Sequence, residues 1–368
     1  MDEEKIYQVA LSMVPGIGDI SAKSLLSYCG SASEVFKCST GKLSGIPGIG
    51  SVTTRAIKDF NSFSSAEKIV ARCLNFNVEI LFYTDKNYPK KLKQAPDGPI
   101  TLYYKGVTDL NRSKIVSIVG TRRSTPYGRE FVDQLIADLR EHHVIIVSGL
   151  AYGIDIQAHR AALKNELPTI GIMASGLDII YPDAHRSTAH EMLEKGGLIS
   201  EHQLGIKPDA HLFPARNRII AGMADAVIVI EAATRGGALI TAEIANSYNR
   251  DVFAVPGNLN RNYSSGCNNL IKNHKAHLLT GIRDLEYIMN WKKGEKNEPR
   301  SMRDINWEAL SDEEASVVRV LLDQPEAVLI DDLSWRSQIP LNKLAINLLN
   351  LELQGIVKAL QGKKYKLY

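Results

Sequence analysis

Hydrophobic residues in the middle of this chain form short runs, and the stretches between these runs carry apolar residues at helical spacing. Runs rich in β-branched residues predict strands, and strands that alternate with helices predict an α/β fold with a parallel sheet. Residues 78–106 predict a segment that leads into the sheet, with an edge strand at Thr101–Tyr104. The predicted strands are Ile115–Val119, Val144–Val147, Thr169–Met173, Ala226–Ile230 and Val252–Val255, and helices between them include Tyr127–Glu141 and Leu239–Asn249.

The first 75 residues predict short helices and contain one repeated pentapeptide. It reads VPGIG at residues 14–18 and IPGIG at residues 46–50, which is the helix-hairpin-helix signature. Two glycines allow a tight turn, and the backbone N–H groups that open the next helix can point at a phosphate. Few cations lie nearby, namely Lys23, Arg55 and Lys58. The turns therefore either contact phosphate or are purely structural parts of a helical, SAM-like domain.

The last part of the chain begins with KKGEKNEPRSMRD, a stretch at residues 292–304 that contains eight charged residues and predicts a flexible linker. The segments after it predict three helices and a terminal hairpin, which indicate a winged helix. They are Glu313–Leu322, Leu329–Trp335, Leu341–Leu353 and Gly355–Tyr368. We therefore predict a helical domain at 1–75, an α/β domain at 76–291, the linker at 292–304 and a winged-helix domain at 305–368.

Composition narrows the class of protein. The 44 basic and 41 acidic residues give a formal charge of +3, so a site for a polyanion has to be a local patch. The four cysteines form no CxxC pair, which supports neither a zinc site nor a disulfide framework and fits a reducing compartment. The start is acidic and polar, and no apolar run approaches the roughly 18 residues of a membrane span. We expect a cytoplasmic protein that does not enter a membrane.

The segments after the predicted strands form the candidate site, because open parallel sheets bind ligands at the carboxyl ends of their strands. Four segments combine glycine with small or hydroxyl residues before a helix, which presents N–H groups and a helix dipole to an anion. Phe213–Arg218 adds cations and an aromatic ring just before the Ala226 strand. The four segments are Gly120–Arg123, Ser148–Gly153, Ala174–Asp178 and Glu231–Ala238.

Five arginines lie in these segments, and the guanidinium fork suits phosphate. Several phosphate sites in series would follow an extended backbone, with Phe213, Tyr152 or Tyr181 available to stack on a base. Alternatively, some arginines, Arg218 above all, pair with acids and only shape the loops; these acids are Asp155, Asp183, Glu231 and Glu243. The predicted DNA-binding residues are Gly120, Thr121, Arg122, Arg123, Ser148, Gly149, Ala151, Tyr152, Gly153, Phe213, Arg216, Asn217, Arg218, Arg235, Gly236 and Gly237.

Enzyme motifs are incomplete in this sequence. It has no GxxxxGK[ST] loop, no GxGxxG after the first strand, no GxSxG elbow and no His and carboxylate cluster with metal-ligand spacing, so we predict no cofactor, metal or catalytic residue. Glu231, with Arg235-Gly236-Gly237 and Glu243 after it, resembles in part the PGGxGTxxE loop of Rossmann-like nucleotide phosphoribohydrolases. The proline is missing and the spacing differs, so such a hydrolase is the alternative function. Surface or helix-capping roles are expected for His159, His185, His190, His202 and His211.

Six motifs follow one another in the α/β domain: VGTR at 119–122, SGLAYGID at 148–155, GLDIIYP at 176–182, FPARNRIIAG at 213–222, RGGALITAEIA at 235–245 and VFAVPG at 252–257. Together with SGCNNLI at 265–271, they resemble the DNA-processing protein A family (DprA or Smf) over residues 88–280. The chain departs from the family's pattern at Tyr152, where a small or basic residue is usual, and at 271–276, where IKNHKA replaces IRxGA. Tyr152 can stack on a base, so the first change need not weaken DNA binding.

This resemblance implies an extended Rossmann-like domain that binds single-stranded DNA without strong sequence preference. It also implies that the protein protects incoming DNA and loads RecA recombinase in natural transformation and homologous recombination, with no established catalytic activity. Carried over to this chain, the motifs place DNA contacts at Gly120, Arg122, Ser148–Ala151 and Phe213–Arg218. The resemblance further implies a homodimer formed around Asn268–His277.

A winged helix at the end of the chain would allow contact with double-stranded DNA. The candidate recognition helix, residues 340–353, offers only Lys343, Asn342 and Asn347 for reading base edges. The wing is richer in cations, with Lys358, Lys363, Lys364 and Lys366. We expect a protein contact or a weak contact with the DNA backbone from the terminal domains, in preference to sequence-specific recognition.

Overall fold

The computed structural model describes residues 3–112, 114–292, 307, 310–324, 327–360 and 363–367. The chain forms two compact units, Met1–Glu295 and Lys296–Tyr368, and each is described by itself. Of the predicted linker, residues 293–304 lie outside the described part of the chain.

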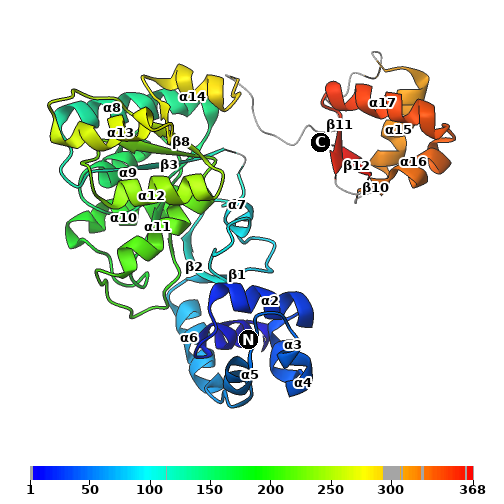
Figure 1. Cartoon of the computed structure of the whole chain (residues 1–368), viewed down its shortest axis with the longest axis horizontal. Helices are drawn as coiled ribbons and strands as arrows, with labels where there is room; N and C mark the ends of the chain where they lie inside the picture. The colour runs from blue at the N-terminus through cyan, green and yellow to red at the C-terminus, as the bar shows by residue number, and fades with distance from the viewer. Residues whose placement is uncertain are drawn as a thin grey trace. The chain divides into compact units, whose positions relative to one another are not determined.

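The sheet of the first unit has nine strands among the described residues, in the order β1-β2-β6-β5-β4-β3-β7-β8-β9 (Figure 1). Neighbouring strands from β6 to β9 run parallel, whereas β1 and β2 add an antiparallel edge. The chain winds outward from β3 in both directions, which is the doubly wound, Rossmann-like arrangement. The strands are β1 (Glu79–Phe82), β2 (Thr101–Gly106), β3 (Ile115–Gly120), β4 (Ile145–Ser148), β5 (Thr169–Ile172), β6 (Gly197–Ser200), β7 (Ala226–Ile230), β8 (Asp251–Ala254) and β9 (His277–Leu278).

The five predicted parallel strands are confirmed as β3, β4, β5, β7 and β8. The parallel strands β6 and β9 were not predicted, because β6 has only two branched aliphatic residues and β9 has only two residues in total. The strand predicted at Thr101–Tyr104 is β2, and it lies second from the edge because β1 pairs along its outer side.

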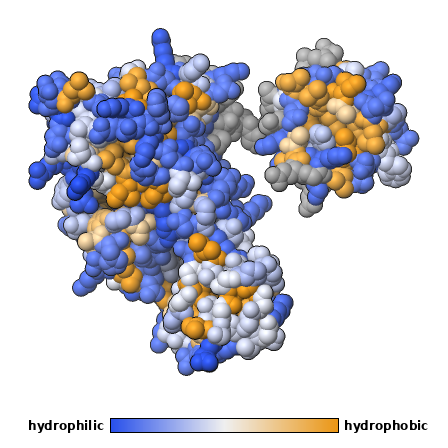
Figure 2. Space-filling view, in the orientation of Figure 1, coloured by the Kyte–Doolittle hydropathy of each residue, from blue (hydrophilic) through white to orange (hydrophobic). Residues whose placement is uncertain are grey.

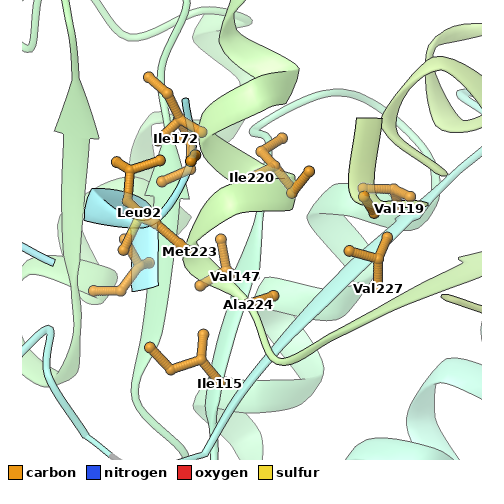
Figure 3. Packing of buried hydrophobic residues seen from close by; sticks show 14 of the residues in the cluster. Leu92, Ile115, Val119, Val147, Ile172, Ile220, Met223, Ala224 and Val227 are labelled. Atoms are coloured by element: carbon orange, nitrogen blue, oxygen red, sulfur yellow. The ribbon is translucent and has the colours of Figure 1, made fainter. Parts of the chain in front are cut away.

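Helices cover both faces of the sheet. On one face, the α11 side chains Ile220 and Met223 pack with sheet residues such as Val119 and Val227 (Figure 3). Strands buried on both faces favour apolar residues at nearly every position, which explains why their sequences are nearly continuous apolar runs. One face is covered by α7 (Lys90–Lys93), α11 (Leu212–Met223), α12 (Gly237–Ser247) and α13 (Ser265–Lys272), and the other by α8 (Pro126–Leu139), α9 (Ile154–Lys164) and α14 (Ile282–Ile288). Beyond α9 lies α10 (Arg186–Lys195), and short 3-10 turns occupy Arg140–His142, Asp183–His185 and Asn262–Ser264.

The helical domain lies against the β1 and β2 edge of the sheet, since Phe82 and Ile100 belong to its apolar core. Gly16 and Gly48 have φ angles of +79° and +81°, so both pentapeptides form turns that favour glycine. Helices α2 and α5 begin shortly after these turns, as the helix-hairpin-helix signature predicts. The helices are α1 (Glu3–Met13), α2 (Asp19–Cys29), α3 (Ala32–Lys37), α4 (Thr40–Ser44), α5 (Ser51–Lys58) and α6 (Phe63–Asn75).

The second unit has the three helices and the hairpin of a winged helix within its described residues. A capping box between Ser311 and Glu314 starts α15, and the apolar faces of the three helices meet in one core. The elements are α15 (Asp312–Leu322), β10 (Val328–Leu329), α16 (Ile330–Ser337), α17 (Leu341–Leu353), β11 (Val357–Leu360) and β12 (Lys364–Leu367). In the part of the chain that the structure describes, no helix is long and apolar enough to span a membrane.

Candidate nucleic-acid interface

A groove of about 800 Å³ opens at the carboxyl ends of β3 and β7. These two strands are neighbours, but the chain continues from them toward opposite sides of the sheet, so the loops after them diverge. The first two turns of α11 form the remaining wall, and Phe213 and Arg216 lie there. The groove therefore lies where a doubly wound sheet is expected to bind a ligand.

Ten of the sixteen predicted site residues line this groove. Tyr152 lines a smaller pocket that shares Arg122 and Arg216 with the groove. The lining of the groove does not include the other five predicted residues, which are Arg123, Ser148, Gly149, Gly153 and Arg218. The ten are Gly120, Thr121, Arg122, Ala151, Phe213, Arg216, Asn217, Arg235, Gly236 and Gly237.

Arg216 is a buried cation in the groove wall, with 4% of its surface exposed. One guanidinium nitrogen donates to the carbonyl of Ile172, whereas Nε has no hydrogen-bond partner among the described residues. The carboxylate of Asp155 is its counter-charge, and burial raises the pKa of Asp155 to about 6 against the opposing effect of Arg216. Burial also lowers the pKa of Arg216 to about 10, so the side chain stays charged at neutral pH.

Glycine at position 149 lets these two charges approach. A Cβ there would lie 2.5 Å from both Arg216 Nη1 and Asp155 Oδ2, so no other residue fits without moving them. Gly149 is not part of the groove lining and lies against the two charged groups, Arg216 and Asp155. This explains its place in the SGLA motif.

Aromatic side chains line the groove next to the exposed Arg122. The Arg122 guanidinium lies over the ring of Phe213, 5.5 Å from its centroid, and Tyr181 lies 5.9 Å from the same ring. Tyr152 contacts the imidazole of His185 edge-on and remains half exposed. Cations and flat rings at one surface are the combination that binds phosphates and stacks on bases.

Two histidines hold the loop after β4 in place. His159 Nε2 donates to the carbonyl of Gly149 at 2.6 Å, and His185 Nδ1 donates to that of Leu150 at 2.8 Å. Both are buried, so the expected surface or capping roles are wrong for these two. Burial lowers the pKa of His159 to about 4, which keeps this imidazole neutral. Their role is to position the loop.

Arg218 points away from the groove. Its guanidinium bonds the carbonyl of Asp97 and the carboxylate of Glu201, and it lies 3.3 Å from the carboxylate of Asp19 in α2. The expected structural role of this arginine agrees with these contacts, although its partners are not the acids considered from the sequence. Asp183 pairs instead with Arg186.

The carboxylates of the hydrolase alternative make structural contacts. Glu231 has a φ of +55° and accepts hydrogen bonds from the backbone N–H and the hydroxyl of Thr125, just before α8. Glu243 forms an exposed pair with Lys275 at 2.7 Å. Among the described residues, no group of three or more His, Cys, Asp or Glu side chains could hold a metal ion.

Two parts of the groove were not foreseen from the sequence. Residues 208–210, from an irregular segment, and Tyr263, from the 3-10 turn Asn262–Ser264, also line it, and both lie outside the segments predicted to form the site. Tyr263 lies just before the SGCNNLI motif, which was the only signal near it. One predicted segment also differs from expectation, because Ala174–Asp178 leads into a turn and then into a 3-10 turn at Asp183–His185.

Comparison with known families accounts for both units. The family model of DNA recombination-mediator protein A matches residues 79–290, and that of the DprA winged helix domain matches residues 306–363. Protein Smf of Synechocystis sp. is 30% identical to this chain, with 99% of each chain covered. DNA processing protein DprA of Streptococcus pneumoniae is 43% identical over 55% of this chain and 71% of that protein.

Solved structures agree with this assignment. The crystal structure of the Streptococcus pneumoniae protein has a TM-score of 0.67 and 32% identity, over 79% of this chain and 99% of that one. A structure that describes a single-stranded DNA binding mode of the Helicobacter pylori protein has a TM-score of 0.53 and 31% identity, over 58% of this chain and 97% of that one. The fold, the winged helix and the family resemblance are thus confirmed, and this chain belongs to the DNA recombination-mediator protein A (DprA) family.

Proposed function

We propose that this chain binds single-stranded DNA along the groove at the carboxyl ends of β3 and β7. The observation that carries the proposal is Arg216, a buried cation in the groove wall whose Nε–H has no acceptor within the described residues. A buried donor without a partner costs about 1–3 kcal/mol. A phosphate oxygen of bound DNA would supply the missing acceptor through a charge-assisted hydrogen bond.

Phosphate contacts extend from Arg216 to both sides of the groove. Arg122 and Arg235 are exposed at its rim, and the glycines before α12 bring backbone N–H groups to the same surface. Arg123 is also exposed and adds a cation beside Arg122. Arg218 does not take part, because its guanidinium is held by Glu201 and Asp19. Contacts to the backbone alone would give little sequence preference.

Bases stack on the aromatic side of the groove. Phe213 and Tyr181 form one platform, and the half-exposed Tyr152 extends it through the adjoining pocket. Stacking on one ring is worth about 1–3 kcal/mol and tolerates any base. The Helicobacter pylori relative, 31% identical to this chain, is described with single-stranded DNA, which supports the same ligand class here.

Membership of the family extends the proposal to the steps after DNA binding. In this proposal the chain acts in the cytoplasm as a homodimer, protects incoming single strands and loads RecA recombinase onto them in natural transformation. The domain at residues 76–291 holds the single strand, without a cofactor.

The contacts of the acidic residues favour binding over hydrolysis of a nucleotide. A carboxylate whose oxygens are held by neighbouring protein groups is poorly placed to act as a general acid or base. Both oxygens of Glu231 are bonded to Thr125, and Glu243 pairs with Lys275. We therefore infer that the chain is not an enzyme.

Replacing Arg122 with alanine tests the groove directly. Arg122→Ala is expected to weaken binding of a fluorescent oligothymidine about tenfold, since a hydrogen bond to a charged group contributes about 1.5–3 kcal/mol. Arg140→Ala is the matched control, because Arg140 is exposed and pairs with Glu166 beyond the carboxyl-terminal end of α8. Equal affinities of the two variants, both folded by circular dichroism, would place the DNA elsewhere. Release of a base or phosphate from a mononucleotide would instead support the hydrolase.

A further inference from the structure

Tyr263 lines the groove but belongs to none of the contacts assigned above. It lies in the 3-10 turn Asn262–Ser264, which follows β8. Tyr181, which forms the aromatic platform with Phe213, follows β5. In the sheet β8 lies four strands from β5, and at roughly 4.8 Å per strand this separates the two strand ends by about 19 Å. The two tyrosines therefore lie on opposite sides of the groove.

Close packing holds this turn against the strand ends. The backbone N–H of Gly266 donates to the carbonyl of Ala232, in the loop after β7, at 2.8 Å. The side chain of Asn268 bonds the N–H and the carbonyl of Gly257, after β8, at 3.1 and 2.9 Å. Ser264 is buried against Gly257, since a Cβ there would lie 2.3 Å from the Ser264 hydroxyl. The turn therefore holds its tyrosine in a fixed position, as a binding platform requires.

The ring of Tyr263 does not serve the stability of the sheet. It is partly exposed, and among the described residues it belongs to neither of the two apolar cores that flank the sheet. The groove on this side is apolar as well, because Ala233 and the 44% exposed Ile240 of α12 line it. Figure 2 shows apolar residues gathered over the part of the first unit that Figure 1 labels α12. A fixed ring beside an apolar wall suits the flat face of a base.

The part of the groove between the two aromatic sides suits phosphates. Arg122 follows β3 and Arg235 follows β7, and both are exposed. Gly236 and Gly237 come next and are also exposed. No atom lies within 4 Å of a Cβ built on Gly236, so a ligand can approach the backbone there. A single strand with its phosphates on this part of the groove can place bases on both aromatic sides.

We propose that Tyr263 stacks on a base of the bound single strand and forms a second aromatic platform of the groove. The strand then runs from the platform of Phe213 and Tyr181 across the exposed arginines to Tyr263. Because about 19 Å exceeds the length of one nucleotide, the groove holds several nucleotides and stacks a base at each end. This inference rests on the proposed single-strand site and adds a contact residue and a length to it.

Substitution of Tyr263 in the full-length chain tests the second platform. Tyr263→Ala is expected to weaken oligothymidine binding about tenfold, as the loss of one stacked base does. The slope of log K against log salt should not change, because no phosphate contact is lost. Tyr263→Phe keeps the ring and should bind within twofold of the unmodified chain. The matched control is Tyr287→Ala, which removes an 85% exposed ring of α14 outside the groove lining. Circular dichroism verifies that all three variants fold.

Photocrosslinking identifies the contact in the unmodified chain. An oligothymidine in which 5-iodouracil replaces thymine should crosslink to Tyr263 and also to Phe213 or Tyr181. Crosslinks at Phe213 or Tyr181 alone would overturn the second platform and leave the groove intact. Equal affinities of Tyr263→Ala and Tyr287→Ala would have the same meaning. If neither side of the groove crosslinks and Arg122→Ala binds normally, the groove itself is wrong, and the platform with it.

Discussion

Asp155 lines the proposed DNA groove even though it is an acid and DNA is an anion. The positive charges of Arg216 and Arg122 face its carboxyl group. The Ser148 side chain and the backbone N–H of Ala151 donate hydrogen bonds to it. Burial already raises its pKa to about 6. A phosphate nearby would raise the pKa further, since two negative charges in one site resist being ionised together. Binding of DNA is therefore expected to be linked to uptake of a proton.

This linkage predicts tighter binding at lower pH. Above pH 6 the Asp155 carboxylate is charged and repels phosphate, and below pH 6 it is neutral, so oligothymidine affinity should rise several-fold from pH 7.5 to pH 5.5. Asp155→Asn removes the titrating group and leaves Arg216 charged, so this variant should bind at pH 7.5 as tightly as the unmodified chain does at pH 5.5. Fluorescence anisotropy across this range measures both. An equal pH dependence in the two proteins would assign the effect to other groups.

At the scale of elements, α11 connects the groove to the helical domain. Residues two apart on a helix point about 200° away from each other, so Arg216 and Arg218 face opposite sides. Arg216 lies in the groove wall, and Arg218 bonds Glu201 and the α2 residue Asp19. Lys23 of α2 adds contacts to the carbonyls of Ala95 and Pro96. The first helix-hairpin-helix turn is therefore fixed against the α/β domain.

Loss of the Arg218 contacts should loosen this attachment. Arg218→Ala leaves Glu201 buried without its partner, which is expected to lower the free energy of unfolding by about 3 kcal/mol. Arg186→Ala is the control, because its pair with Asp183 is exposed and contributes less than about 1 kcal/mol. Urea denaturation compares the two variants. Similar midpoints would show that the α11 and α2 contact adds little stability.

The elements also show what can be predicted from sequence and what cannot. Buried parallel strands have a strong signal because most of their residues are apolar, so β3, β4, β5, β7 and β8 were all identified, and the loops after β3 and β7 could be located from them. The short β6 and β9 have no comparable signal. Tyr263, residues 208–210 and the partners of Arg218 come from distant parts of the chain, and only the packing of the helices brings them to their places. Local pattern carries no information about such contacts.

At the scale of the whole molecule, the net charge is nearly balanced although the chain has two cationic surfaces. The formal charge is +3, yet the groove gathers Arg122, Arg216 and Arg235 in the first unit and the wing gathers four lysines in the second. The groove arginines lie within the part that the family model of DNA recombination-mediator protein A covers, whereas the winged-helix model ends before Lys364 and Lys366. We therefore expect the affinity of this chain for DNA to come from local patches and to fall with salt.

Hydrogen–deuterium exchange of the full-length chain, with and without oligothymidine, locates the bound single strand without any substitution. We expect slower exchange in the loops after β3, β4 and β7 and at the start of α11, because bound phosphates engage or cover the backbone N–H groups there. The turns at Gly16 and Gly48 and the wing should change little. Protection confined to those turns or to the wing, with the groove loops unchanged, would show that the groove is not the single-strand site.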